Sequence, residues 1–157
     1  MKIIKGDFLS PESYIAIVVA RFNDFINKVL LNGAIEILER IGQISNKNIT
    51  IVWVPGAYEL PLISQILSNS KKYNAIIALG TIIKGNTSHF NYVSNSVSTS
   101  INNVILKTEI PIIFGILTTN NIEQAINRAG CKSGNKGSEA ALNALEMINI
   151  INKINNI

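Results

Sequence analysis

The hydrophobic positions of this chain fall into four short, nearly continuous runs that are rich in β-branched residues. The runs cover residues 14–20, 49–54, 75–80 and 111–117. Apolar runs of this length without polar alternation are typical of strands that are buried on both faces. The pattern therefore predicts four strands of a sheet that is covered on both sides.

Between these runs the apolar residues recur at helical spacing. The expected helices cover residues 25–41, about 59–68, about 90–107, a short segment after residue 121, and 136 to about 154. Asn23 is the expected cap of the first helix, and Gly42 is its expected stop. The tail after Asn149 alternates Ile and Asn, and we expect residues 150–157 to be frayed.

Strands that alternate with helices favour a parallel sheet built from right-handed crossovers. We expect one domain over residues 1–157, a three-layer α/β sandwich with a four-stranded parallel sheet flanked by helices. Residues 1–10 lie outside the alternation. They are expected to form either an edge strand or an arm onto a neighbouring subunit.

Charge is scarce in this sequence. Charged residues make up 15% of it, against about 25% in an ordinary soluble domain. Such a chain covers itself with neutral polar residues such as Asn, buries part of its surface in an oligomer, or does both.

The apolar runs are shorter than the roughly 20 residues that span a bilayer, and the amino terminus does not resemble a secretory signal. We expect a cytoplasmic protein that does not enter the membrane.

The composition also limits the chemistry. One cysteine, Cys131, and one histidine, His89, exclude a disulfide framework and the usual Cys/His zinc sites. The net charge is +4, but the basic residues are scattered. Nucleic-acid binding is therefore unsupported, and a small anionic ligand would explain the balance equally well.

Ligands of open α/β sheets bind beyond the carboxyl ends of the strands. Polar residues, glycines and the only histidine follow those ends here, in segments 20–23, 54–61, 80–90 and 117–120. Asn86, Thr87 and Ser88 lie at the start of a helix, where they would either bind a phosphate or only cap the helix. His89 follows them and is a candidate general acid or base, although a lone histidine is more often structural.

Other candidates have equally plain structural interpretations. The glycines of 130–137 lack the spacing of a phosphate loop, and Arg128 before them either clamps a phosphate or complements a helix dipole. Phe22 and Phe114 would stack on a flat heterocycle or belong to the core. Glu59 and Glu139 would contact a polyol or cap helices.

Six segments together resemble the 6,7-dimethyl-8-ribityllumazine synthase family, which carries out the penultimate step of riboflavin biosynthesis. They occur in the family's order, at 21–23, 54–61, 80–90, 114–119, 124–130 and 134–141. Lys84 stands where the family usually has arginine, and Asn86 stands at a variable position. The resemblance implies a flavodoxin-like fold and a condensation of 5-amino-6-(D-ribitylamino)uracil with 3,4-dihydroxy-2-butanone 4-phosphate. That reaction releases phosphate and water, and it uses no metal or organic cofactor.

The resemblance also implies roles for particular residues. His89 would transfer protons. The groups that bind the ribitylaminouracil would be Phe22, Asn23, Ala57, Tyr58, Glu59, Thr81, Ile82, Ile83, Phe114, Lys136 and Glu139. The groups that bind the phosphate would be Asn86, Thr87 and Arg128.

In the family, Phe114, Arg128, Lys136 and the residue at Glu139 come from the adjacent subunit. The family forms pentamers or sixty-subunit icosahedral shells, and the turn at 130–135 resembles that of shell formers, so we expect a shell. Riboflavin synthase is a candidate partner. Two alternatives remain open: a flavodoxin-like module that binds flavin or lumazine without turnover, and a related riboflavin synthase that acts on two lumazines.

Overall fold

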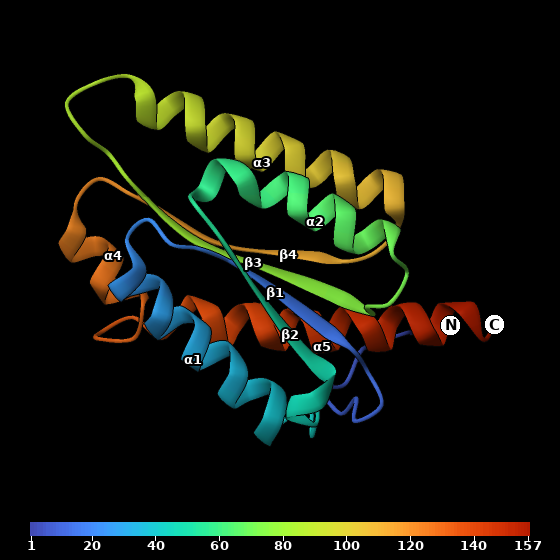
Figure 1. The fold of residues 1–157 in the computed structure, drawn as a ribbon. Coiled ribbons are helices and arrows are strands. Elements are labelled where there is room, and N and C mark those ends of the chain that lie inside the picture. The colour runs from blue at the N-terminus through green and yellow to red at the C-terminus, as the bar shows by residue number, and fades with distance from the viewer.

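The computed structural model describes residues 1–157. A four-stranded parallel sheet lies between two layers of helices (Figure 1), which confirms the predicted three-layer α/β fold. The strand order is β2-β1-β3-β4. The strands are β1 (Ile15–Ala20), β2 (Ile49–Val54), β3 (Ala75–Ile83) and β4 (Ile112–Thr119).

Each helix layer covers its own face of the sheet. One layer holds α1 (Asp24–Arg40), α4 (Ile122–Arg128) and α5 (Lys136–Asn155), and the other holds α2 (Leu60–Asn69) and α3 (His89–Thr108) (Figure 1). Two short 3₁₀ turns, Asn46–Asn48 and Ala57–Glu59, precede β2 and α2.

The alternation of side chains along β1 explains the two layers. Ile15, Ile17 and Val19 belong to the core under α1 and α5, whereas Ala16 and Val18 belong to the core under α2 and α3. All of these residues are fully buried. The central strand is apolar on both faces for this reason, as the sequence indicates.

Two strands are longer than predicted. The predicted strands end at Gly80 and Leu117, but β3 and β4 remain paired as far as Ile83 and Thr119. Thr81 is buried within β3 although it is polar. The last residues of β3 are therefore held rigidly by the sheet.

The ends of α1 differ from the sequence prediction in detail. Asn23 precedes the helix in a left-handed conformation (φ 64°), and its side chain does not cap it. At the other end the helix finishes at Arg40, and Gln43 rather than Gly42 takes a positive φ (54°). Gly42 is required by space, because a Cβ there would lie 2.7 Å from the carbonyl oxygen of Leu38.

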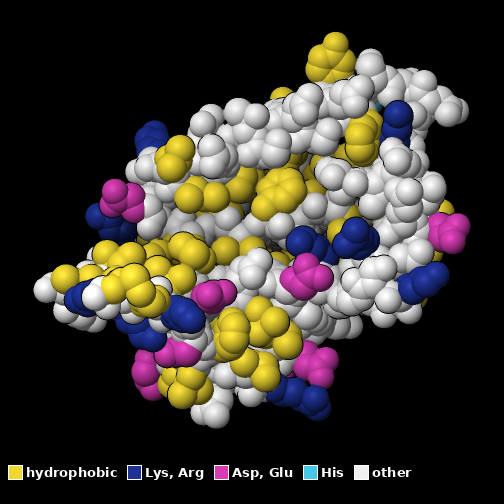
Figure 2. Space-filling model, turned by 180° about the vertical axis from the view of Figure 1, so that it is seen from behind, with side chains coloured by type: hydrophobic (Ala, Val, Ile, Leu, Met, Phe, Trp, Pro, Cys, Tyr) yellow, Lys and Arg dark blue, Asp and Glu magenta, His cyan; other side chains and the backbone are white.

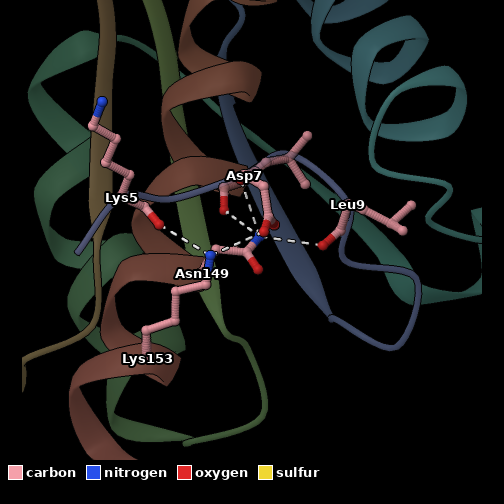
Figure 3. Close-up of polar contacts among 6 residues, drawn as sticks. Lys5, Asp7, Leu9, Asn149 and Lys153 are labelled. Carbon is pink, nitrogen blue, oxygen red and sulfur yellow. Dashed lines mark hydrogen bonds and ion pairs between the residues drawn. The ribbon is translucent and has the colours of Figure 1, made fainter. Parts of the chain in front are cut away.

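Residues 1–10 form no edge strand. They form an arm that packs on α5 of the same chain, and the expected contact with a neighbouring subunit stays a prediction. The arm runs along α5 (Figure 3). The side-chain nitrogen of Asn149 donates to the carbonyl oxygens of Asp7 (3.1 Å) and Leu9 (3.2 Å). Lys153 Nζ donates to the carbonyl oxygen of Lys5 (3.0 Å) and pairs with the Asp7 carboxylate (3.0 Å).

These contacts also involve the end of α5, which the sequence predicts near residue 154 and within a frayed tail at 150–157. The helix α5 continues to Asn155. The alternation of Ile and Asn after Asn149 resembles an unstable end, but Ile148 is buried and the polar residues Asn149 and Lys153 bind the arm. Contacts distant in sequence therefore stabilise this end of the helix.

The surface is poor in charge, as the composition indicates. Figure 2 shows apolar side chains across the middle of one face, between areas of neutral polar side chains, with charged groups scattered around them. None of the helices combines the length and the apolar character that crossing a membrane requires.

Candidate active site

A cavity of about 440 Å³ opens at the carboxyl ends of β1, β2 and β3. This is the edge at which open α/β sheets bind ligands. Ten of the predicted site residues line the cavity: Phe22, Asn23, Ala57, Tyr58, Glu59, Thr81, Ile82, Ile83, Thr87 and His89. The fold thus brings together groups from three separate strand ends.

The turn after β1 supplies an aromatic face. The backbone N–H of Phe22 donates to the carbonyl oxygen of Pro55 (3.1 Å), which fixes the turn to the end of β2. The Phe22 side chain is 74% exposed at the cavity, so its ring is free to stack on a flat ligand. Asn23 Nδ2 donates to the Thr81 carbonyl oxygen (2.9 Å), so the Asn23 side chain joins β1 to β3 instead of capping α1.

The turn after β2 supplies polar groups. Glu59 Oε2 accepts a hydrogen bond from the backbone N–H of Gly56 (2.9 Å), which closes the turn. Glu59 also lines the cavity, next to the exposed Tyr58. Its carboxylate therefore has a structural role at the turn, and its contact with a polyol stays a prediction.

The segment after β3 supplies a histidine beside a helix terminus. His89 is the first residue of α3, and its backbone N–H donates to Thr87 Oγ1 (3.4 Å). The N–H groups at the start of a 20-residue helix carry a partial positive charge that favours an anion. The backbone N–H of Lys84 donates to the Thr119 carbonyl oxygen (2.8 Å), which ties this loop to β4. A helix terminus that favours an anion and the only imidazole of the chain are thus adjacent.

Asp24, the acidic residue in the first turn of α1, is unsuited to proton donation. Lys28 Nζ lies 2.6 Å from Asp24 Oδ2. The hydrogen bond and the positive charge of Lys28 lower the pKa of the Asp24 carboxyl. That carboxyl remains ionised at neutral pH. Because Asp24 does not line the cavity, His89 is the stronger candidate for acid–base chemistry.

Five predicted site residues do not line this cavity. Asn86 is exposed in the loop between Gly85 and Thr87, and Phe114 is half-buried in β4 against the core under α3. The other three are further along the chain. Arg128 is exposed in the last turn of α4 and is absent from the four ion pairs of the chain, and Lys136 and Glu139 pair with each other (3.1 Å) at the start of α5.

Some lining residues were not predicted as site residues. They are Pro55, Gly56, Gly85, Phe90 and Val93. Asn27, which lies behind the cavity and hydrogen-bonds to residues that line it, was also missed. A polar residue at a buried position of the helical pattern is the signal that identifies it. No group of three or more His, Cys, Asp or Glu residues is arranged to hold a metal ion.

Comparison with known proteins assigns a family. The model of a family described as 6,7-dimethyl-8-ribityllumazine synthase matches residues 12–152. Proteins named 6,7-dimethyl-8-ribityllumazine synthase from Yersinia pestis (strain Pestoides F) and Yersinia pseudotuberculosis serotype O:1b (strain IP 31758) are each 56% identical over 154 residues. The alignments cover 98% of this chain and 99% of each relative.

Proposed function

The chain belongs to the 6,7-dimethyl-8-ribityllumazine synthase family, and we propose that it makes this lumazine. The substrates are 5-amino-6-(D-ribitylamino)uracil and 3,4-dihydroxy-2-butanone 4-phosphate, and the reaction releases phosphate and water. The observation that carries the proposal is the cavity in which Phe22, Asn23 and Glu59 lie together with His89. It offers an aromatic face, hydrogen-bonding groups and a proton-transfer group for one flat, polar substrate.

The steps of the reaction match these groups. The 5-amino group of the uracil attacks the ketone and forms a Schiff base with loss of one water. Phosphate then leaves by β-elimination, the resulting enol becomes a ketone, and the ribitylamino nitrogen attacks that ketone and closes the ring with loss of a second water. Each step adds or removes a proton, and His89 at the cavity would transfer these protons. One imidazole contributes about 10²–10⁴-fold, and the orientation of two reactants supplies much of the rest.

The uracil would lie against Phe22, with its ring edge and ribityl chain along the segment 57–59 and residues 81–83. The exposed Phe22 ring and the partly exposed Glu59 carboxylate support this pose. The phosphate would bind at the N–H groups of Asn86 and Thr87, near the start of α3. The phosphate would thus anchor the substrate beside His89 and would also be the group that leaves in the elimination.

Arg128 would complete the phosphate site from a neighbouring subunit. Its guanidinium is exposed, is absent from the ion pairs of its own chain and does not line its own cavity. Phe114, Lys136 and Glu139 would also come from the neighbouring subunit, where they would contact the ribitylaminouracil. An arginine binds a phosphate through two parallel hydrogen bonds, and here it would reach the cavity of the next copy.

The assembly we propose is a pentamer, twelve of which form a shell. Large apolar side chains are exposed on the edge strand β2 (Ile51, Trp53) and on α2 (Leu62, Ile66), and a contact between subunits would cover them. The turn at 130–135 supports the shell because it resembles the turn of shell formers. Light scattering on the purified chain should give the mass of a sixty-subunit particle, whereas a mass of five chains would contradict the shell.

The activity is tested by incubating the purified chain with both substrates and following lumazine fluorescence. Lumazine formation that requires both substrates supports the proposal. Riboflavin made from lumazine alone would favour the alternative of a riboflavin synthase that acts on two lumazines. Bound lumazine with no turnover would instead identify a binding module, and either result would refute the proposed condensation.

A further inference from the structure

Asn27 is a polar residue on the buried face of α1 and has no exposed surface. Its neighbours on that face, Ile26, Leu30 and Ala34, are apolar and fully or almost fully buried. A buried amide is unfavourable unless its donors and acceptor are hydrogen-bonded. The identity of this residue is therefore explained by the polar groups that it contacts and not by the apolar core around it.

The hydrogen bonds of Asn27 all go to strand ends at the cavity. Its amide nitrogen Nδ2 donates to the carbonyl oxygens of Ala20 (2.7 Å) and Phe22 (2.9 Å). Its oxygen Oδ1 accepts from Thr81 Oγ1 (2.6 Å). Both amide hydrogens are used, and two carbonyl partners require the nitrogen on their side, so the orientation of the amide is fixed.

These bonds form a closed loop with the cavity wall. Asn23 Nδ2 donates to the carbonyl oxygen of Thr81, whose hydroxyl donates to Asn27. Phe22, Asn23 and Thr81 line the cavity, whereas Asn27 does not. Asn27 therefore links the turn after β1 to the end of β3 from behind, without reaching the space that a substrate occupies.

We propose that Asn27 is a positioning residue for the ribitylaminouracil, an inference that rests on the proposed function. It sets the separation between the Phe22 ring and the Thr81 backbone, which would face each other across the pyrimidine. The turn it stabilises passes through the left-handed conformation of Asn23, which the chain adopts less readily than ordinary backbone. A displacement of about 1 Å in such a wall lowers catalysis by about 10²-fold.

The test compares Asn27→Leu with Leu38→Val. Leucine keeps the branched shape of asparagine, although its two methyl groups are larger than the amide oxygen and nitrogen, and it removes the three hydrogen bonds. We expect the KM for ribitylaminouracil to rise about tenfold or more, while the KM for the butanone phosphate changes less than about twofold. Leu38 is fully buried on the same helix and far along it from the cavity. Leu38→Val should lower thermal stability and leave both KM values unchanged.

A double-mutant cycle on kcat/KM tests the hydrogen bond between Asn27 and Thr81 from the Thr81 side as well. Thr81→Val removes the hydroxyl that donates to Asn27 while preserving the side-chain shape. We expect Asn27→Leu and Thr81→Val to be strongly non-additive, because each breaks the same loop. Additive effects would overturn the inference. If Asn27→Leu does not fold, Thr81→Val still provides a test. The inference requires Thr81→Val to raise the KM for ribitylaminouracil and to leave the KM for the butanone phosphate unchanged.

The failure of this inference differs from the failure of the proposed function. A wild-type chain that forms no lumazine overturns the proposed function and this inference together. An active wild-type chain whose Asn27→Leu variant has the same KM values as Leu38→Val overturns the positioning role alone. In that case Asn27 only stabilises the fold.

Discussion

Asn135 joins three helices, and its removal should destabilise the chain more than the removal of an ordinary helix cap. Its Oδ1 accepts from the backbone N–H groups of Gly137 (2.8 Å) and Ser138 (3.1 Å) at the start of α5. Its Nδ2 donates to the carbonyl oxygens of Val29 in α1 (3.0 Å) and Ala129 after α4 (2.9 Å). The variant Asn135→Ala removes all four bonds at once.

The magnitude follows from these contacts. Loss of the cap costs about 1 kcal/mol, and loss of the part-buried bond to Ala129 costs about 1 kcal/mol more. The bond to Val29 is exposed, so water replaces most of it. The sum is about 2–3 kcal/mol. Asn121→Ala is the matched control, because Asn121 caps α4 through one bond to the N–H of Gln124 (2.9 Å) and its loss costs about 1 kcal/mol.

The measurement is thermal unfolding at one fixed protein concentration, because assembly stabilises subunits by mass action. For a chain of this size, 1 kcal/mol corresponds to about 2–4 °C in Tm. We expect Asn135→Ala to lower Tm by about 4–12 °C and Asn121→Ala by about 2–4 °C. Equal shifts for the two variants would refute the idea that Asn135 holds the helices together beyond capping α5.

Two further predictions concern the chemistry. His89→Ala should lower kcat by about 10²–10⁴-fold with little change in either KM, measured by steady-state lumazine formation; an unchanged kcat would remove His89 from proton transfer. Arg128→Ala should raise the KM for the butanone phosphate by about 10- to 100-fold, since a charge-assisted bond is lost, while the KM for ribitylaminouracil stays the same. Arg128→Lys should recover part of the loss, and an unaltered KM for the phosphate substrate in Arg128→Ala would refute the clamp.

The sequence predicts the sheet well because burial on both faces leaves continuous apolar runs. The runs at 14–20 and 75–80 correspond to the central strands β1 and β3, and the polar segments after the strands supply most of the cavity. The true end of β3 was missed because Thr81 is polar, yet its hydroxyl is satisfied by Asn27. A buried polar residue with a distant partner looks like a loop residue when the chain is read locally.

The other misses also arise from contacts between distant residues. The expectation of a frayed tail at 150–157 takes no account of the arm, which contacts α5 from 142 and 148 residues away in sequence. Asn23 follows the pattern of a cap, but the left-handed backbone directs its amide to Thr81. The residues alone leave Arg128 with two interpretations, a phosphate clamp or a helix-dipole contact, and the resemblance favours the clamp. Within one chain it does not line the cavity, which is why a neighbouring copy enters the proposed mechanism.

A shared active site can be tested by mixing two variants at a butanone phosphate concentration below the wild-type KM, where each variant by itself has little activity. His89→Ala chains keep Arg128, and Arg128→Ala chains keep His89, so an intact site arises only where the two kinds of subunit meet in the right order. When both are co-expressed in equal amounts and assemble at random, about one quarter of the sites should be intact and lumazine formation should recover to about one quarter of the wild-type rate. Mixed assemblies no more active than the two parent variants would contradict a site built from two copies of this chain.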